Sequence, residues 1–99
     1  MNDWERAHRT AQIYKEAYPS GTRVLLVQMS DPYHPVESGM RGTVCFVDDL
    51  GTVHIDWDNG RGLGVVPGKD EFRKLTEEEL AQELREEQQA QQVLDEQTM

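Results

Sequence analysis

The feature that most constrains the fold lies in the middle of the chain and has the pattern of a β-hairpin. Apolar and polar residues alternate over Arg41–Val47 and again over Thr52–Trp57, and a tight turn containing Gly51 joins the two runs. Asn59-Gly60 follows, and Asn-Gly is a preferred pair for a two-residue turn between antiparallel strands. The pattern therefore predicts three consecutive antiparallel strands, the third over Leu63–Pro67.

The alternation also predicts the register of these strands. If Asp48 lies opposite Gly51, all the large apolar residues of the hairpin share one face, whereas a shift by one residue would mix the faces. The outer face then carries Thr43, Cys45, His54 and Asp56. The opposite pairs expected are Gly42–Trp57, Val44–Ile55 and Phe46–Val53, followed by Asp58–Arg61, Trp57–Gly62 and Ile55–Gly64 across the second turn.

The residues before the hairpin predict a helix and then a strand. Asn2 and Glu5 have the spacing of a capping box, and Pro19-Ser20-Gly21 ends the helix, so we expect helix over residues 2–18. Thr22–Met29 is a nearly continuous apolar strand. The apolar stripe of the helix is expected to dock on the strands and consists of Trp4, Ala7, Ala11, Tyr14 and Tyr18.

Residues 19–75 are predicted to form one small domain. A long loop, Ser30–Gly39, follows the first strand, and Lys69–Leu75 supplies a last short strand or a helical turn. Five short strands with a long first loop indicate a mainly β fold, a small SH3-like barrel. We expect the helix over residues 1–18 and an acidic C-terminal helix to flank it.

Residues 76–99 are predicted to form that acidic, Gln- and Glu-rich helix. Thr76 and Glu79 have capping-box spacing, and Leu80 and Leu84 make one apolar contact stripe. Beyond about Glu87 little remains to be buried, so we expect fraying or disorder there.

Charge is distributed unevenly along the chain, whose net charge is -9. Residues 76–99 contain eight acids and one base (-7), and residues 1–75 contain eleven acids and nine bases (-2). This balance argues against direct nucleic-acid binding, because affinity for phosphates comes from Lys and Arg. It suits a basic protein partner instead, or simply serves solubility. The single cysteine and the lack of a long apolar run lead us to expect a cytoplasmic protein that does not contact membranes.

No motif predicts catalysis, and we expect no enzyme activity and no cofactor. Cys45 and His54 are placed opposite each other with Asp56 nearby, and these are metal-ligand types. The chain has no recognised metal-ligand spacing, and no orienting group completes a nucleophilic site. Gly60–Gly64 lacks the Lys and Ser/Thr of a phosphate-binding loop. We therefore expect neither a metal site nor catalytic residues.

Two regions are candidates for partner binding. Tyr33 and His34 lie in the long loop, where an aromatic residue either grips a peptide or folds back to cap the core. Arg41 and Arg61 either contact an acidic partner or balance local carboxylates. The acidic candidates are Glu77, Glu78, Glu79, Glu83, Glu86 and Glu87.

Parts of the chain resemble known families. Pro19–Val24, Asp31-Pro32-Tyr33 and the hairpin from Gly42 to Gly60 resemble a family of uncharacterised domains of Gram-positive bacteria, their phages and their conjugative elements. The hairpin is also similar to Mib/Herc2-type SH3-like domains, which bind peptide segments. The first resemblance implies a mobile-element setting, in which short acidic proteins often inhibit host defence proteins, as anti-CRISPR proteins do.

The leading hypothesis is a non-catalytic protein-binding module, in its most concrete form an anti-CRISPR-like acidic inhibitor of a host nucleic-acid-handling protein. One alternative is an SH3-like adaptor that binds peptides through Tyr33. Another is a nucleic-acid-binding barrel, which requires its basic residues to converge on one face. These are Arg23, Arg41, Arg61, Lys69, Arg73 and Lys74. The sequence leaves the oligomeric state open.

Overall fold

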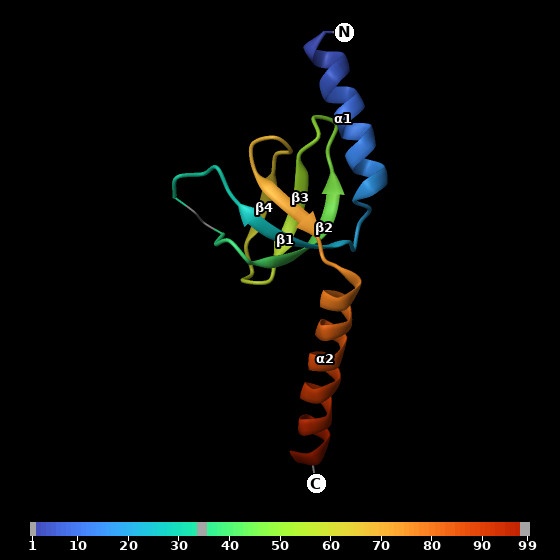
Figure 1. The fold of residues 1–99 in the computed structure, drawn as a ribbon, viewed down its shortest axis with the longest axis vertical. Helices are drawn as coiled ribbons and strands as arrows, with labels where there is room; N and C mark the ends of the chain where they lie inside the picture. The colour runs from blue at the N-terminus through green and yellow to red at the C-terminus, as the bar shows by residue number, and fades with distance from the viewer. Residues whose placement is uncertain (1, 34–35, 98–99) are drawn as a thin grey trace.

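A computed structural model describes residues 2–33 and 36–97, with side chains described as far as residue 90 (Figure 1). A five-stranded sheet lies between two helices. The elements in chain order are α1 (Asp3–Ala17), β1 (Arg23–Gln28), β2 (Arg41–Val47), β3 (Val53–Trp57), β4 (Gly62–Val65), β5 (Glu71–Lys74) and α2 (Glu77–Gln97).

The sheet has the strand order β4-β3-β2-β1-β5, and all neighbouring strands are antiparallel. This confirms a mainly β fold with a helix at each end. The predicted strand over residues 41–47 is observed with the same bounds, and the last segment, left open between strand and helical turn, contains strand β5.

The hydrophobic core lies against one face of the sheet. Alternate residues of the strands point into it, as the period of two requires. The Trp57 indole is buried in this core and donates a hydrogen bond of 3.0 Å to the Leu63 carbonyl, which satisfies its polar atom. The buried core cluster consists of Val24, Leu26, Met29, Val36, Val44, Val47, Val53, Ile55, Trp57 and Val65.

The predicted register holds in the first half of the hairpin and is wrong in the second. Gly42 pairs with Trp57 and Val44 with Ile55, as expected. A β-bulge then inserts an extra residue, Cys45, so that the following pairs are shifted.

The bulge reverses the faces of the two residues after it. Phe46 pairs with His54 instead of Val53, and its side chain is 55% exposed. It stacks on the His54 ring, with 4.4 Å between ring centroids. Val47 pairs with Val53 and takes the core position that the sequence predicts for Phe46. The alternation could not reveal this, because both residues are apolar.

The register across the β3–β4 turn is also wrong by one residue. Gly62 pairs with Asp56 and Gly64 with His54. The cause is a longer turn, because the Trp57 amide donates to the Arg61 carbonyl at 2.8 Å and closes the turn one residue earlier than expected. Gly60 has a φ of 89°, which favours glycine in such a turn.

Helix α1 docks on the sheet with only part of its apolar stripe. Asn2 caps the helix and accepts a hydrogen bond of 2.7 Å from the Glu5 amide, as predicted. Ala11 is buried, and Tyr14 and Tyr18 pack against the core. The prediction is wrong for Trp4, which is 70% exposed.

The reason is that α1 overhangs the sheet. A Cβ atom added at Gly51 in the β2–β3 turn would lie 3.7 Å from the Ala11 amide nitrogen, so the turn meets the helix at Ala11. The preceding turns of α1 extend past the edge of the sheet (Figure 1).

Helix α2 begins with the predicted capping box and projects away from the sheet (Figure 1). The Glu79 amide donates to Thr76 Oγ1 at 3.1 Å, and the Thr76 amide donates to Glu79 Oε1 at 2.8 Å. The helix extends to Gln97. The fraying or disorder expected after about Glu87 stays a prediction. No helix of the described chain is both long and apolar enough to cross a membrane.

We predict that Gly42→Ala destabilises the fold. The added Cβ would lie 2.6 Å from Ile55 Cγ2 and 2.8 Å from Trp57 Cε3, inside the core. We expect a loss of about 1–3 kcal/mol in the free energy of unfolding, measured by urea denaturation. The control is Gly62→Ala, whose nearest contact is 3.7 Å from Asp56 Oδ1. It should stay within about 0.5 kcal/mol of wild type. Equal effects at both positions would contradict the prediction.

Candidate functional site

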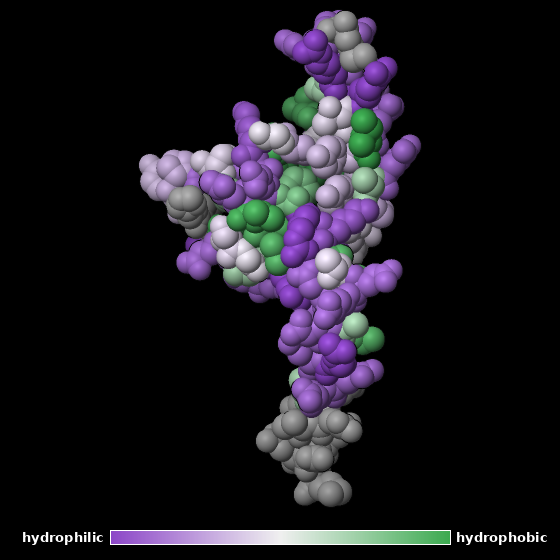
Figure 2. Space-filling view, viewed as in Figure 1, coloured by the Kyte–Doolittle hydropathy of each residue, from purple (hydrophilic) through white to green (hydrophobic). Residues whose placement is uncertain are grey.

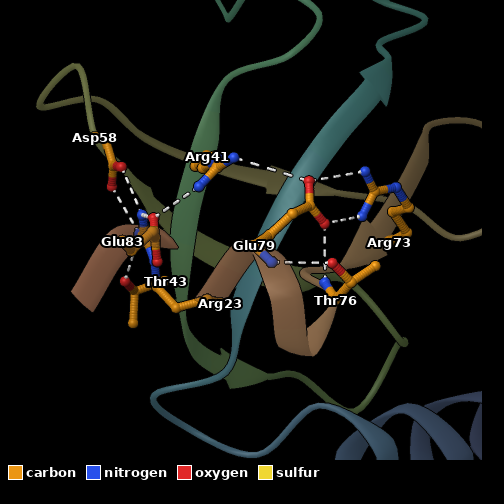
Figure 3. A network of polar contacts seen from close by, with 8 residues as sticks. All are labelled: Arg23, Arg41, Thr43, Asp58, Arg73, Thr76, Glu79 and Glu83. Atoms are coloured by element: carbon orange, nitrogen blue, oxygen red, sulfur yellow. Dashed lines mark hydrogen bonds and ion pairs between the residues drawn. The ribbon is translucent and has the colours of Figure 1, made fainter. Parts of the chain in front are cut away.

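Three arginines from three strands converge on the outer face of the sheet. Arg41 on β2 and Arg73 on β5 lie on either side of Leu25 on β1. Arg23 precedes Leu25 by two residues and therefore shares its face. Paired residues of neighbouring strands point to the same side, so the three guanidinium groups form one surface, which we call the arginine face (Figure 3).

Arg23 binds two carboxylates. It donates to both oxygens of Asp58, at 2.8 and 2.7 Å, and to both oxygens of Glu83, at 3.1 and 2.6 Å. Its Nη1 also donates to Thr43 Oγ1 at 3.1 Å. Bidentate contacts of this kind are the strongest geometry for an arginine–carboxylate pair.

The other two arginines bind the first turns of α2. Arg73 donates to both oxygens of Glu79, at 2.7 and 3.1 Å. Arg41 lies between the two glutamates, 3.8 Å from Glu79 Oε2 and 3.4 Å from Glu83 Oε2. Two glutamates one helical turn apart thus connect α2 to three strands (Figure 3).

The ion pairs shift the pKa values of their members. The Arg73 guanidinium, together with the Thr76 amide, lowers the pKa of Glu79 to about 2. Arg23 lowers the pKa values of Asp58 and Glu83, and their carboxylates in turn raise the pKa of Arg23. All these groups are therefore charged at neutral pH.

The structure divides the predicted partner-binding residues into two groups. Arg41, Glu79 and Glu83 are partly buried and paired with one another, so Arg41 balances local carboxylates. The exposed group consists of Tyr33, Arg61, Glu77, Glu78, Glu86 and Glu87. His34 lies outside the described residues.

In the long loop, the residue that packs in the core is Val36 and not Tyr33. Tyr33 is 90% exposed and does not cap the core. Val36, in the same loop, is buried in the core cluster. Tyr33 therefore remains accessible to a partner.

The Cys45–His54 pair predicted to face each other is not formed. The bulge moves Cys45 out of register, and His54 Nε2 instead lies 2.9 Å from Asp48 Oδ2. Burial, with a further contribution from Asp56, raises the pKa of the Cys45 thiol, which disfavours a reactive thiolate. Among the side chains that the structure describes, those of residues 2–33 and 36–90, no group of three or more His, Cys, Asp or Glu is arranged to hold a metal ion.

A second surface was not predicted and lies where α1 overhangs the sheet. Trp4 is 70% exposed and stacks on the His8 ring at 5.2 Å, and Leu50 in the β2–β3 turn is 77% exposed. Trp4, Ala7, His8, Asp49 and Leu50 line a cleft of about 270 Å³, which we call the Trp4–Leu50 cleft. Leu50, an apolar residue in an otherwise polar turn, was the sequence signal for it.

The fold and these surfaces define a small mainly β domain with two flanking helices that are attached differently, α1 by apolar packing and α2 by ion pairs. The chain belongs to the family described as a domain of unknown function (DUF4314), whose model matches residues 7–75. The match ends immediately before the capping box of α2. A comparison with curated proteins found no match.

We predict that the attachment of α2 weakens in acid. The native pKa of Glu79, about 2, lies below its ordinary value, so its contribution to stability is present above about pH 5 and is lost as the pH falls towards 2. Glu83 and Asp58 are lowered in the same direction and add to the effect.

The measurement is urea unfolding of the wild type and of the Glu79→Gln/Glu83→Gln variant across this pH range. The difference in their unfolding free energy should be present at pH 7 and shrink towards zero near pH 2. The control is Glu86→Gln/Glu87→Gln, which makes the same charge change outside the ion-pair network. A difference that stays constant with pH would contradict the prediction.

Proposed function

We propose that this protein is a non-catalytic protein-binding module that holds its partner at the Trp4–Leu50 cleft. The observation that carries the proposal is the exposure of Trp4 and Leu50 on either side of one cleft. Exposed aromatic side chains beside a cleft are typical binding anchors, because most of their apolar surface is removed from water only in a complex.

The partner supported by this geometry is a protein that inserts an apolar side chain. Trp4 and Ala7 come from α1 and Leu50 from the β2–β3 turn, so the cleft has apolar walls on two elements. Asp49 at its rim is paired with Lys15. Binding by apolar contact depends little on salt, since screening acts on charges.

As part of this proposal, the sheet closes as an SH3-like barrel. The support is that β1 pairs with β2 along one edge and with β5 along the other. A register shift between Leu26 and Gln28 allows β1 to bend between these partners. The long β1–β2 loop is also found in that architecture.

We predict that Trp4→Ala/Leu50→Ala weakens partner capture about tenfold or more, because truncating an aromatic anchor commonly costs about 2 kcal/mol or more. The measurement is quantitative capture from nuclease-treated lysate of cells that carry the gene, in low and high salt. The control is Ile13→Ala, an exposed residue of the same helix that does not line the cleft.

The expected result is a protein that both wild type and the Ile13 variant retain in high salt and that the double variant loses. Proteins captured equally by all three chains would count against the cleft. If the Ile13 variant loses capture as well, substitutions in α1 weaken capture by disturbing the fold and not by removing a contact in the cleft.

A second candidate function is an acidic inhibitor of a nucleic-acid-handling protein. The observation that favours it is the projection of α2, which exposes Glu86 and Glu87 beyond its attachment to the sheet (Figure 1). Such a complex depends on charge and is lost in high salt.

We predict, for this candidate, that replacing Glu77, Glu78, Glu86 and Glu87 with Gln abolishes a salt-sensitive capture. The Trp4→Ala/Leu50→Ala variant should retain it. Capture that survives the four Gln substitutions would reject the acidic-inhibitor function and leave the cleft as the binding surface.

A further inference from the structure

Helix α2 is attached to the sheet almost entirely by charge. From residue 77 to residue 90, no side chain is fully buried, and Glu79 and Glu83 are the least exposed residues. Leu80 and Leu84 are 42% and 56% exposed. The face of α2 that is visible in Figure 2 is also mostly hydrophilic. The ion pairs of the arginine face therefore carry the attachment.

An attachment of this kind is reversible. Partly exposed ion pairs are individually weak and are screened by salt, whereas apolar burial is not. Since α2 follows β5 directly in the chain, it rebinds from an effective concentration on the order of millimolar. Another ligand of the same chemistry is therefore in competition with α2.

The arginine face selects a defined arrangement of carboxylates. Glu79 and Glu83 are four residues apart on one face of a helix, and each is bound by two of the three arginines. The forked guanidinium groups of Arg23 and Arg73 each bind a carboxylate through two hydrogen bonds. This geometry fixes both the spacing and the orientation of the groups bound.

The surface under α2 is basic once the helix leaves. Of their ion-pair partners, Arg23, Arg41 and Arg73 then keep only Asp58, so the net charge of the ion-pair network changes from zero to +2. These residues all lie within residues 7–75, the part that matches the family, whereas α2 lies outside it. The sheet therefore presents a complete carboxylate-binding surface without α2.

We propose that the arginine face is a binding site for an acidic helix of a partner protein with two carboxylates four residues apart, and that α2 occupies this site as an internal competitor. The site is independent of the Trp4–Leu50 cleft. A helix is favoured over nucleic acid because the occupant observed is helical, Asp58 stands within the face, and the chain carries a net charge of -9.

The test measures binding of a fluorescent, end-blocked peptide of residues 76–90 to the full-length chain by anisotropy. The Glu79→Gln/Glu83→Gln chain, whose α2 no longer competes, should bind it about tenfold or more tightly than wild type. The matched Glu86→Gln/Glu87→Gln chain has the same net charge and should bind as weakly as wild type.

Two further controls identify the surface. A peptide with Gln in place of Glu79 and Glu83 should bind at least about tenfold more weakly to the Glu79→Gln/Glu83→Gln chain, because it lacks the paired carboxylates. Adding Arg73→Ala to that chain should weaken binding of the original peptide to a similar degree. Circular dichroism and urea unfolding establish that each variant is folded.

Several results would overturn the proposal. These are the absence of peptide binding by the folded Glu79→Gln/Glu83→Gln chain, equal binding of both peptides, and no effect of Arg73→Ala. If a single-stranded oligonucleotide binds more tightly than the peptide, the ligand of the arginine face is a nucleic acid and not an acidic helix. Because no variant in this series alters the cleft, failure here leaves the test of the proposed function unaffected.

Discussion

The close approach of β2 and β3 at Gly42 is the constraint on which the rest of the structure depends. The absence of a side chain there allows Ile55 and Trp57 to pack over the backbone of the central strand. That contact fixes the register of β3. The Asp58 amide then donates to the Arg41 carbonyl at 2.9 Å, which brings the following turn against β2. Asp58 is thereby placed within reach of Arg23. The packing at Gly42 thus positions both the core residues and one carboxylate of the arginine face.

The two ends of the chain are attached by different forces. Helix α1 buries Ala11, and Tyr14 and the C-cap residue Tyr18 pack against Phe72, with ring centroids 6.2 and 5.4 Å from that ring. Helix α2 buries no side chain fully between residues 77 and 90 and relies on arginine–carboxylate pairs. Salt and acid therefore act mainly on α2, because α1 has apolar burial besides its one ion pair to the sheet, Lys15–Asp49, and screening and protonation affect charges but not apolar burial. The two helices extend from the sheet in opposite directions (Figure 1).

Much of the local structure was predictable, since it depends on neighbouring residues. The Asn2 cap of α1, the capping box of α2, the bounds of β2 and the first pairs of the hairpin follow from spacing and alternation. The candidate site was predictable only in part. Arg41, Glu79 and Glu83 were identified as charged candidates, but pairing among them needs strands and a helix that are distant in sequence. Trp4 lies on the helical face that the sequence predicts to be buried. It is exposed because α1 extends past the sheet at that end.

The sequence by itself determined the type of each element, the start of each helix, the end of α1 and the concentration of acid in the C-terminal segment, because these depend on residues a few positions apart. Only the tertiary structure decided the bulge at Cys45, the outward position of Phe46 and the convergence of three arginines on α2. An extra residue in one strand is compatible with the local pattern, and its position is selected by core packing across the sheet. The charges likewise meet because strands that are far apart in sequence lie side by side, and backbone hydrogen bonds fix their register.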